Sequence, residues 1–286
     1  MKYYFIFILL IISTTLTAQN IEENPALAGR LNGNTAKLIT CTEHATIKDS
    51  PGKETTFLHR TYTYNEGKLI SDITFKNAVS PDSVFILYSY TDTLLQTKQI
   101  SQHINMESDL QETLTEHYAY NQAAKLLRKT IITASGDTTV YRYSYNTSGL
   151  VDTIFADSAE DRRYVHYYSS GKLIRKTSET PVKDSAGWLL LGIYTYEYDK
   201  QGHLTSELHV YKNMERKKSH FVYDNKGRLI KKTVYVYADT KPVYTTEYIY
   251  DKKSGLPAGR VVKWLPDKNK LAYKTASFTY SYNYGK

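Results

Sequence analysis

The sequence predicts an all-β fold: an antiparallel meander of about nine β-hairpin repeats that forms a strongly coiled sheet, a spiral or a barrel. The first indication is tyrosine, which accounts for 28 of the 286 residues, against 8 Phe and 2 Trp. Aromatic side chains are enriched in strands, where they pack on a pleated, half-buried surface. The second is an internal repeat, in which two aromatic residues one position apart are followed by Asp or Asn about every 27 residues. Only 7 Pro and 14 Gly occur, which excludes collagen-like and Pro-rich low-complexity chains.

Each repeat carries a turn signal directly after its second tyrosine. In the unit around Tyr198, Lys200-Gln201-Gly202 fits a three-residue hairpin loop that ends with glycine in the left-handed conformation. In a shorter unit, Glu66-Gly67 fits a two-residue loop. The Asp or Asn before the loop can accept hydrogen bonds from the turn backbone. The residues expected to form these repeat turns are Asn65, Gly67, Gly149, Gly171, Asp199, Gly202, Asp224, Gly227, Asp251 and Gly255.

The loops determine which residues of a hairpin face each other. Tyr198 is expected opposite Leu204, and an uninterrupted register then places Tyr196 opposite Ser206. Counting two strands for each repeat gives roughly sixteen to eighteen strands in total. Open twisted sheets rarely exceed ~10 strands, so a sheet of this size is expected to coil or to close.

The same register predicts a tyrosine-rich, apolar face and a mostly polar face. In the unit around Tyr145, Phe155 falls on the tyrosine face and Ile154 on the opposite face. In the preceding unit, Arg128 falls on the tyrosine face and Lys129 on the other.

The clearest repeats resemble the YD (RHS-type) repeats, whose pattern is Tyr-x-Tyr-Asp-x-x-Gly-Arg-Leu. Phe221–Leu229 matches this pattern nearly residue for residue, and Tyr196–Leu204 matches it with His203 in place of Arg. The resemblance covers residues 57–286 and is weaker around Tyr90 and Tyr120. The chain is also similar to small secreted bacterial proteins of unknown function built from such units, some described as porin-like. The resemblance implies a β-hairpin spiral or barrel that displays a binding surface.

The first residues have the order of a secretory signal peptide. Met1-Lys2 is a short basic region, Tyr3–Ile12 is apolar, and a polar stretch leads to Ala18. We expect residues 1–18 to be a signal peptide, 19–56 an N-terminal loop with one strand over Lys37–Ile47, and 57–286 the YD-like β-hairpin repeat domain. This leader predicts export to the periplasm, the cell surface or the extracellular space. No later stretch is apolar for long enough to form a transmembrane helix.

Positive charge is concentrated in the second half of the chain. Residues 19–163 contain 14 basic and 18 acidic residues, whereas residues 164–286 contain 22 and 11. A stripe of cations on the outgoing strands is the candidate anion-binding surface: Lys172, Arg175, Lys176, Arg228, Lys231 and Lys232. An acidic polysaccharide or another envelope component is the expected partner, and nucleic acid is not. The alternative is that these side chains only solvate strands and discourage edge-to-edge pairing.

The sequence contains no pattern that indicates catalysis, a cofactor or a metal. The eight His residues are scattered, and no HExxH, G-x-S-x-G or P-loop pattern occurs. Cys41 is the only cysteine and lies in an alternating strand pattern, so it is expected to be buried and to form no intramolecular disulfide. We therefore predict a non-enzymatic exported protein that acts as a binding or structural surface. The alternatives are an outer-membrane β-barrel, whose strands have a similar length, and an enzyme with an unrecognised site.

Overall fold

The computed structural model describes residues 38–284 except 50–52, 67, 76–82, 107, 158–160, 184, 212–214, 237–240 and 265–273. The predicted signal peptide, the loop before residue 38 and the turn residue Gly67 lie outside the described residues. The described residues form eighteen strands: β1 (Leu38–Asp49), β2 (Lys53–Asn65), β3 (Lys68–Phe75), β4 (Ser83–Thr91), β5 (Leu94–Met106), β6 (Ser108–Tyr120), β7 (Leu126–Thr133), β8 (Thr138–Tyr145), β9 (Val151–Asp157), β10 (Arg162–Ser169), β11 (Lys172–Pro181), β12 (Trp188–Tyr198), β13 (Leu204–Tyr211), β14 (Glu215–Tyr223), β15 (Leu229–Val236), β16 (Tyr244–Tyr250), β17 (Pro257–Trp264) and β18 (Lys274–Tyr284). The all-β prediction and the predicted number of strands are confirmed.

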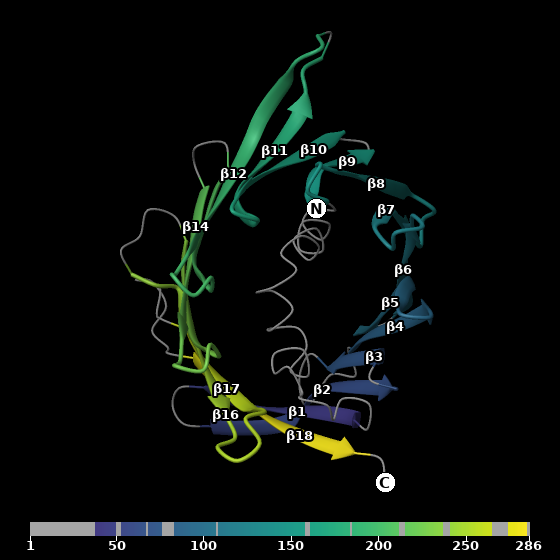
Figure 1. Ribbon diagram of the computed structural model, residues 1–286. Coiled ribbons are helices and arrows are strands. Elements are labelled where there is room, and N and C mark those ends of the chain that lie inside the picture. Colours follow the sequence, from purple (N-terminus) through teal and green to yellow (C-terminus); the bar gives the residue numbers. More distant parts are fainter. Residues whose placement is uncertain are drawn as a thin grey trace.

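The strands form a closed barrel, one of the shapes that the sequence predicted. Each strand pairs antiparallel with its neighbours in the chain, and β1 also pairs with β18. Figure 1 shows the resulting ring, with β1 beside β18. Cys41 on β1 pairs with Tyr282 on one side and with Tyr62 on the other. The single strand predicted before the first repeat is therefore the strand that closes the barrel and leaves no free sheet edge.

The hairpin turns have the predicted geometry. The Asp199 N–H donates to the His203 carbonyl at 2.9 Å, and the Gly202 N–H donates to the Asp199 carbonyl at 3.1 Å, which closes a three-residue loop. Tyr198 pairs with Leu204 as expected. Five turn glycines have φ between 74° and 93°, a region that L side chains avoid: Gly149, Gly171, Gly202, Gly227 and Gly255.

A β-bulge lies directly beyond each Tyr–Leu pair, and here the predicted uninterrupted register is wrong. In the Tyr198 hairpin, Glu197 pairs with Ser206 and Tyr196 with Glu207, so Thr205 has no partner of its own. The same shift follows the pairs made by Tyr64, Tyr90, Tyr120, Tyr145, Tyr168, Tyr223 and Tyr250. A bulge inserts one extra residue into one strand of a pair. Each later residue of the outgoing strand therefore lies on the face opposite to that predicted.

The bulges correct the predicted faces of the outgoing strands. Ile154 pairs with Tyr143 and is 3% exposed, whereas Phe155 lies on the other face and is 39% exposed. Lys129 pairs with Tyr118 and is buried, whereas Arg128 pairs with Ala119 on the opposite face. The prediction had these assignments reversed.

The tyrosine face is the inner face of the barrel. Side chains on the concave side of a closed sheet converge and bury one another, whereas those on the convex side diverge. Tyr62 and Tyr196 on the tyrosine face are 1% and 5% exposed, but Leu87 and Val222 on the opposite, outer face are 54% and 47% exposed. The inner face is thus the packed side of the sheet.

The second tyrosine of most repeats joins neighbouring hairpins. The Tyr198 hydroxyl donates a hydrogen bond of 2.9 Å to the carbonyl of Leu173, which belongs to the preceding hairpin. The same contact to the preceding hairpin, at 2.7–2.9 Å, is made by Tyr90, Tyr120, Tyr145, Tyr168, Tyr250 and Tyr282. Phenylalanine has no hydroxyl to donate, so this contact explains why the repeat uses tyrosine at this position.

We expect Tyr198→Phe to lower the free energy of unfolding by about 1–3 kcal/mol, because the half-buried Leu173 carbonyl loses its donor. Tyr167→Phe is the matched control, since Tyr167 lies on the outer face and is 42% exposed. Urea unfolding of both variants tests the prediction. If both variants lose the same free energy of unfolding, the hydrogen bond between hairpins contributes no specific stability.

Ala124 occupies the turn position that glycine holds in other repeats. Its φ is 58°, and its N–H donates to the Asn121 carbonyl at 3.0 Å, as the Gly202 N–H does to Asp199. Left-handed backbone costs an L residue roughly 1–2 kcal/mol. We therefore expect Ala124→Gly to stabilise the protein by about 0.5–1 kcal/mol, measured by urea unfolding. Gly202→Ala should have the opposite sign, and a loss of stability in Ala124→Gly would contradict the turn assignment.

Candidate functional site

The six cations of the predicted stripe do not share one surface. Because of the bulges, Arg175 and Lys231 lie on the outer face, whereas Lys176 and Lys232 lie on the inner face. Lys176 is 5% exposed and pairs with His166 across β10 and β11. The six cations therefore do not form the single exposed stripe that was predicted. The remaining two, Lys172 and Arg228, lie at the hairpin turns.

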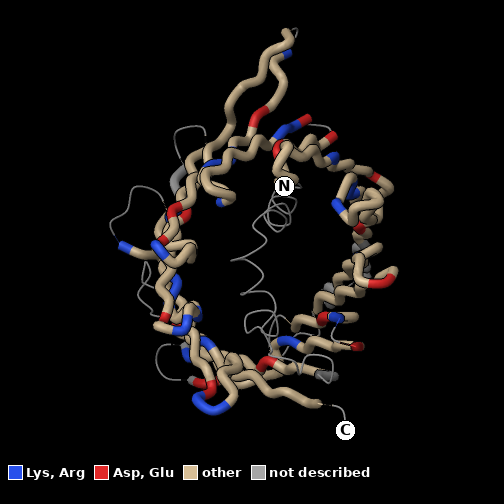
Figure 2. The backbone as a smooth tube through the Cα atoms, viewed as in Figure 1, with Lys and Arg blue, Asp and Glu red and all other residues tan. Residues whose placement is uncertain are grey.

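Those turns lie together at one end of the barrel. Strands alternate in direction in an up-and-down meander, so every turn that follows a tyrosine pair is at the same end. Along hairpins β10–β11 to β16–β17 this end carries six cations, which we call the turn rim: Lys172, Lys200, Lys226, Arg228, Lys252 and Lys253. Figure 2 shows that Lys and Arg positions also gather on the side of the barrel formed by β14–β17. Successive hairpins are two strands apart, so their turns are spaced by roughly 10 Å.

Two of these cations pack on the tyrosines of the next repeat. Lys172 Nζ lies 5.4 Å from the centroid of the Tyr198 ring, and the Arg228 guanidinium lies 4.6 Å from that of Tyr250. The four lysines Lys200, Lys226, Lys252 and Lys253 are exposed. None of these four lysines belongs to the predicted stripe, although their place in the turn pattern is visible in the sequence.

The acidic groups of the turn rim bind within their own turns. The backbone N–H and hydroxyl of Ser254 donate to Asp251 and lower the pKa of its carboxyl group. Asp224 accepts the backbone N–H of Arg228 and forms an ion pair of 2.7 Å with its side chain. These carboxylates act as turn residues, as predicted, and leave the exposed lysines as the outward-facing charges of the rim.

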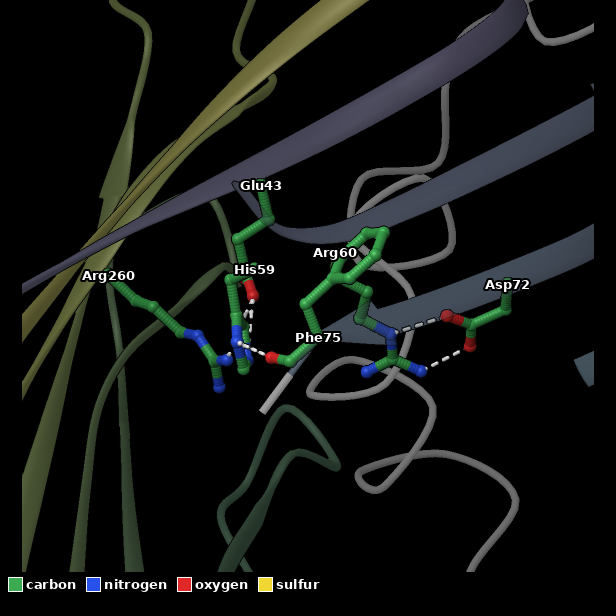
Figure 3. A network of polar contacts seen from close by, with 6 residues as sticks. All are labelled: Glu43, His59, Arg60, Asp72, Phe75 and Arg260. Carbon is green, nitrogen blue, oxygen red and sulfur yellow. Dashed lines mark hydrogen bonds and ion pairs between the residues drawn. The ribbon is translucent and has the colours of Figure 1, made fainter. Parts of the chain in front are cut away.

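A second set of charges is buried on the inner face where β1 closes the barrel (Figure 3). A carboxylate oxygen of Glu43 on β1 lies 3.4 Å from Arg260 Nη2 on β17 and 3.6 Å from His59 Nε2 on β2. Arg60 forms a two-bond ion pair with Asp72 on β3. Glu43 and Asp72 are each 1% exposed. Burial lowers the pKa of His59, which favours its neutral form. These ion pairs therefore lie on the closing strand β1 and on three other strands, β2, β3 and β17.

Cys41 lies beside this network. It is fully buried against Tyr62 and Tyr64, as the alternating pattern predicted. Burial, with a contribution from the Glu43 carboxylate, raises the pKa of the Cys41 thiol to about 12. The thiol therefore stays protonated at neutral pH, and the thiolate is the reactive form of cysteine.

A third set of buried polar groups crosses β10–β13. His166, Lys176, Tyr194 and His209 form one row on the inner face, each paired with the next. Lys176 Nζ lies 4.0 Å from the Tyr194 ring centroid, and His209 stacks on the same ring at 3.9 Å. Burial lowers the pKa of Lys176 to about 8 and those of both histidines to about 4.

Comparison with known proteins identifies a structural relative but no family. No family model matches the chain, and no curated protein matches it. A crystal structure of a porin-like protein from Bacteroides uniformis has a TM-score of 0.53 at 11% sequence identity, and the match covers 86% of this chain and 98% of that one. A porin-like protein from Bacteroides vulgatus matches with a TM-score of 0.26 at 13% identity, over 83% and 97% of the two chains. The TcdB2-TccC3-TEV structure matches with a TM-score of 0.32 at 10% identity, over 81% and 18%. The first relative shares the fold of this barrel.

The described residues contain no metal-binding cluster and no long apolar helix. Among those residues, no three His, Cys, Asp or Glu side chains come together where they could hold a metal ion. The same part of the chain has no helix long and apolar enough to cross a membrane.

Proposed function

We propose that this chain is an exported β-barrel that binds an anionic polymer of the cell envelope, such as an acidic polysaccharide, and catalyses no reaction. The turn rim carries the proposal. Its cations come from four consecutive hairpins at roughly 10 Å intervals. A polymer with regularly spaced negative charges can contact several turns at once, whereas a small ion contacts one. The signal-peptide pattern of residues 1–18 supports action outside the inner membrane.

We expect the protein to be retained on immobilised heparin and on polygalacturonate, and to elute at a salt concentration that depends on the turn rim. Attraction between exposed charges is screened over ~8 Å at physiological salt, so retention should weaken steeply as salt is added. Replacing Lys226, Lys252 and Lys253 with Gln should abolish retention at about 0.15 M salt.

The matched control changes three exposed lysines at the opposite end of the barrel, Lys48, Lys183 and Lys241, to Gln. This variant has the same net charge as the turn-rim variant. Equal loss of retention in both would show that net charge alone, rather than the turn rim, causes binding.

A second candidate function is that of an outer-membrane barrel, which the fold shared with a porin-like protein favours. The outer face opposes it. Arg142 and Asp157 form an exposed ion pair there, and Lys263 pairs with Glu247 at 3.1 Å. A Lys or Arg facing lipid at mid-depth costs roughly 2–4 kcal/mol. We therefore expect the protein to be recovered without detergent after cell fractionation. Recovery only in the detergent-extracted membrane fraction would favour the barrel in the membrane.

A further inference from the structure

The outer face of β9–β12 carries an aromatic patch, made of the exposed Phe155 and Leu190 and the half-buried Arg163, Glu179 and Trp188. Phe155 and Leu190 are 39% and 46% exposed. The ring centroids of Phe155 and Trp188 are 6.4 Å apart, with the planes at 63°. The Arg163 guanidinium lies 4.2 Å from the centroid of the Trp188 ring. Two aromatic rings and a planar cation thus form one continuous surface.

Sheet pairing fixes the patch in place. Phe155 pairs with Arg163, Arg163 with Glu179 and Glu179 with Leu190, so these four residues form one row across β9–β12. Arg163 Nε donates a hydrogen bond of 2.7 Å to Glu179 Oε2. Residues held by strands present a more precise surface than residues on loops. The β11–β12 hairpin, which carries Glu179, Trp188 and Leu190, extends beyond the rest of the ring (Figure 1).

The chemistry of the patch indicates the kind of ligand. Exposed apolar surfaces rimmed by polar groups mark binding sites. The Arg163–Glu179 pair carries no net charge, so the patch does not select an anion. The pair would also lose its hydration if lipid covered it, at a cost of several kcal/mol per ion, which opposes insertion into a membrane. A sugar ring satisfies both parts of the patch, because its C–H face packs on aromatic rings and its hydroxyls both donate and accept hydrogen bonds.

We propose that this patch binds the pyranose rings of a neutral oligosaccharide. Phe155 and Trp188 provide the stacking surface. Arg163 donates to sugar hydroxyls, and Glu179, which already accepts from Arg163 and Thr177, holds the guanidinium in place.

A second aromatic–arginine pair extends the surface along the same strands. Tyr167, four residues after Arg163 on β10, is 42% exposed on the outer face, and Arg175 lies 5.2 Å from the centroid of its ring. Four residues of strand span about 13 Å. Two stacking positions at this separation fit an oligosaccharide better than a single sugar.

This proposal does not depend on the turn rim. The two surfaces share no residue, and Trp188 follows the β11–β12 turn at the opposite end of the barrel. Neutral sugars test the patch, whereas heparin tests the turn rim, so either proposal can fail alone.

The experiment uses tryptophan fluorescence of the full-length protein. The chain has two tryptophans, so Trp264→Phe leaves Trp188 as the only reporter. Cellohexaose, xylohexaose, mannohexaose and maltohexaose are each titrated to about 5 mM, where a site with Kd near 1 mM is mostly filled. We expect a saturable change in Trp188 emission with at least one of them.

Calorimetry with the responding sugar then tests the residues. Trp188→Ala and Phe155→Ala should each weaken binding at least tenfold, and Leu87→Ala, which removes an exposed outer-face side chain outside the patch, should change it less than twofold. Circular dichroism identifies a variant that fails to fold. If one of the two aromatic variants does not fold, the affinity of the other one tests the proposal. The proposal is overturned if no hexasaccharide changes the emission, or if neither aromatic variant weakens binding. It is also overturned if sedimentation shows a dimer that Trp188→Ala dissociates, since a second copy would then cover the patch.

Discussion

Glu43→Ala should lower the free energy of unfolding by about 3–5 kcal/mol, because it leaves the Arg260 guanidinium buried without its carboxylate. Glu43 is 1% exposed, and the Arg260 side chain is 18% exposed. Arg260 Nε already has no hydrogen-bond partner in the structure, and the guanidinium otherwise packs on the Phe278 ring, 4.2 Å from its centroid. Tyr280 on β18 also donates a hydrogen bond to Glu43, and burial raises the pKa of that tyrosine. Loss of one carboxylate therefore affects contacts with three other strands.

The loss should be greatest where β1 closes the barrel. Hydrogen exchange of the amides in β1, measured beside urea unfolding, should show faster opening of residues 40–48 than of the β12–β13 hairpin. Glu54→Ala is the matched control, since Glu54 forms the solvent-exposed ion pair with Lys48 at the other end of β1. Surface pairs of this kind contribute little. A Glu43→Ala protein as stable as the Glu54→Ala protein would show that β1 is held by its backbone pairing alone.

The local part of the fold could be predicted from the sequence because each hairpin turn is specified within five residues. Asp199 and Gly202 lie three positions apart, and together they define the loop and the Tyr198–Leu204 pair. The repeat then fixes the number of strands. Closure of the ring depends instead on β1, which precedes the first repeat and pairs with the last strand of the chain. No local pattern specifies a pairing over that distance.

The faces could not be predicted beyond the Tyr–Leu pair, because one unpaired residue reverses the alternation. Thr205 and its counterparts in other repeats have no common residue type, so the bulge leaves no sequence signal. Its consequence is chemical. Without it, Lys176 would face solvent and Arg175 would face inwards, whereas in the structure Lys176 lies among Tyr194 and His209 on the inner face. Lys176 therefore cannot belong to an exposed anion-binding stripe. The turn rim, which shares Lys172 and Arg228 with that stripe, is the proposed anion-binding surface instead.

Lys176→Met should raise the free energy of unfolding at pH 7 by about 1–3 kcal/mol, because it replaces a buried cation by an apolar side chain of similar length. Lys176 is 5% exposed, and burial lowers its pKa to about 8. The inner-face groups around it are Tyr164 and His166 on β10, Tyr194 on β12, and Glu207 and His209 on β13. Glu207 is the charge that favours the protonated lysine, and its effect is smaller than that of burial.

The pH dependence identifies Lys176 as the cause. Between about pH 8 and 10.5, the unfolded chain holds a proton on Lys176 that the folded protein has released. Unfolding therefore takes up a proton and becomes less favourable as the pH rises through this range. Below pH 8, burial of the charged lysine destabilises the wild-type protein by its full amount. Above pH 10.5 the lysine is neutral in both the folded and the unfolded state, and this destabilisation is absent. The advantage of Lys176→Met over wild type should accordingly be largest at pH 7 and should shrink towards pH 10.5.

Urea unfolding of both proteins at pH 7 and at pH 10 measures this difference directly, and comparison at each pH cancels the titration of the tyrosines that the two proteins share. Lys183→Met, at the exposed β11–β12 turn, serves as the control and should show the same small effect at both pH values. A Lys176→Met protein that is less stable than wild type at pH 7 would reverse the conclusion. The attraction between Lys176 and Glu207 would then outweigh the cost of burying the lysine, and the inner-face row of β10–β13 would be a source of stability rather than a site where stability is lost.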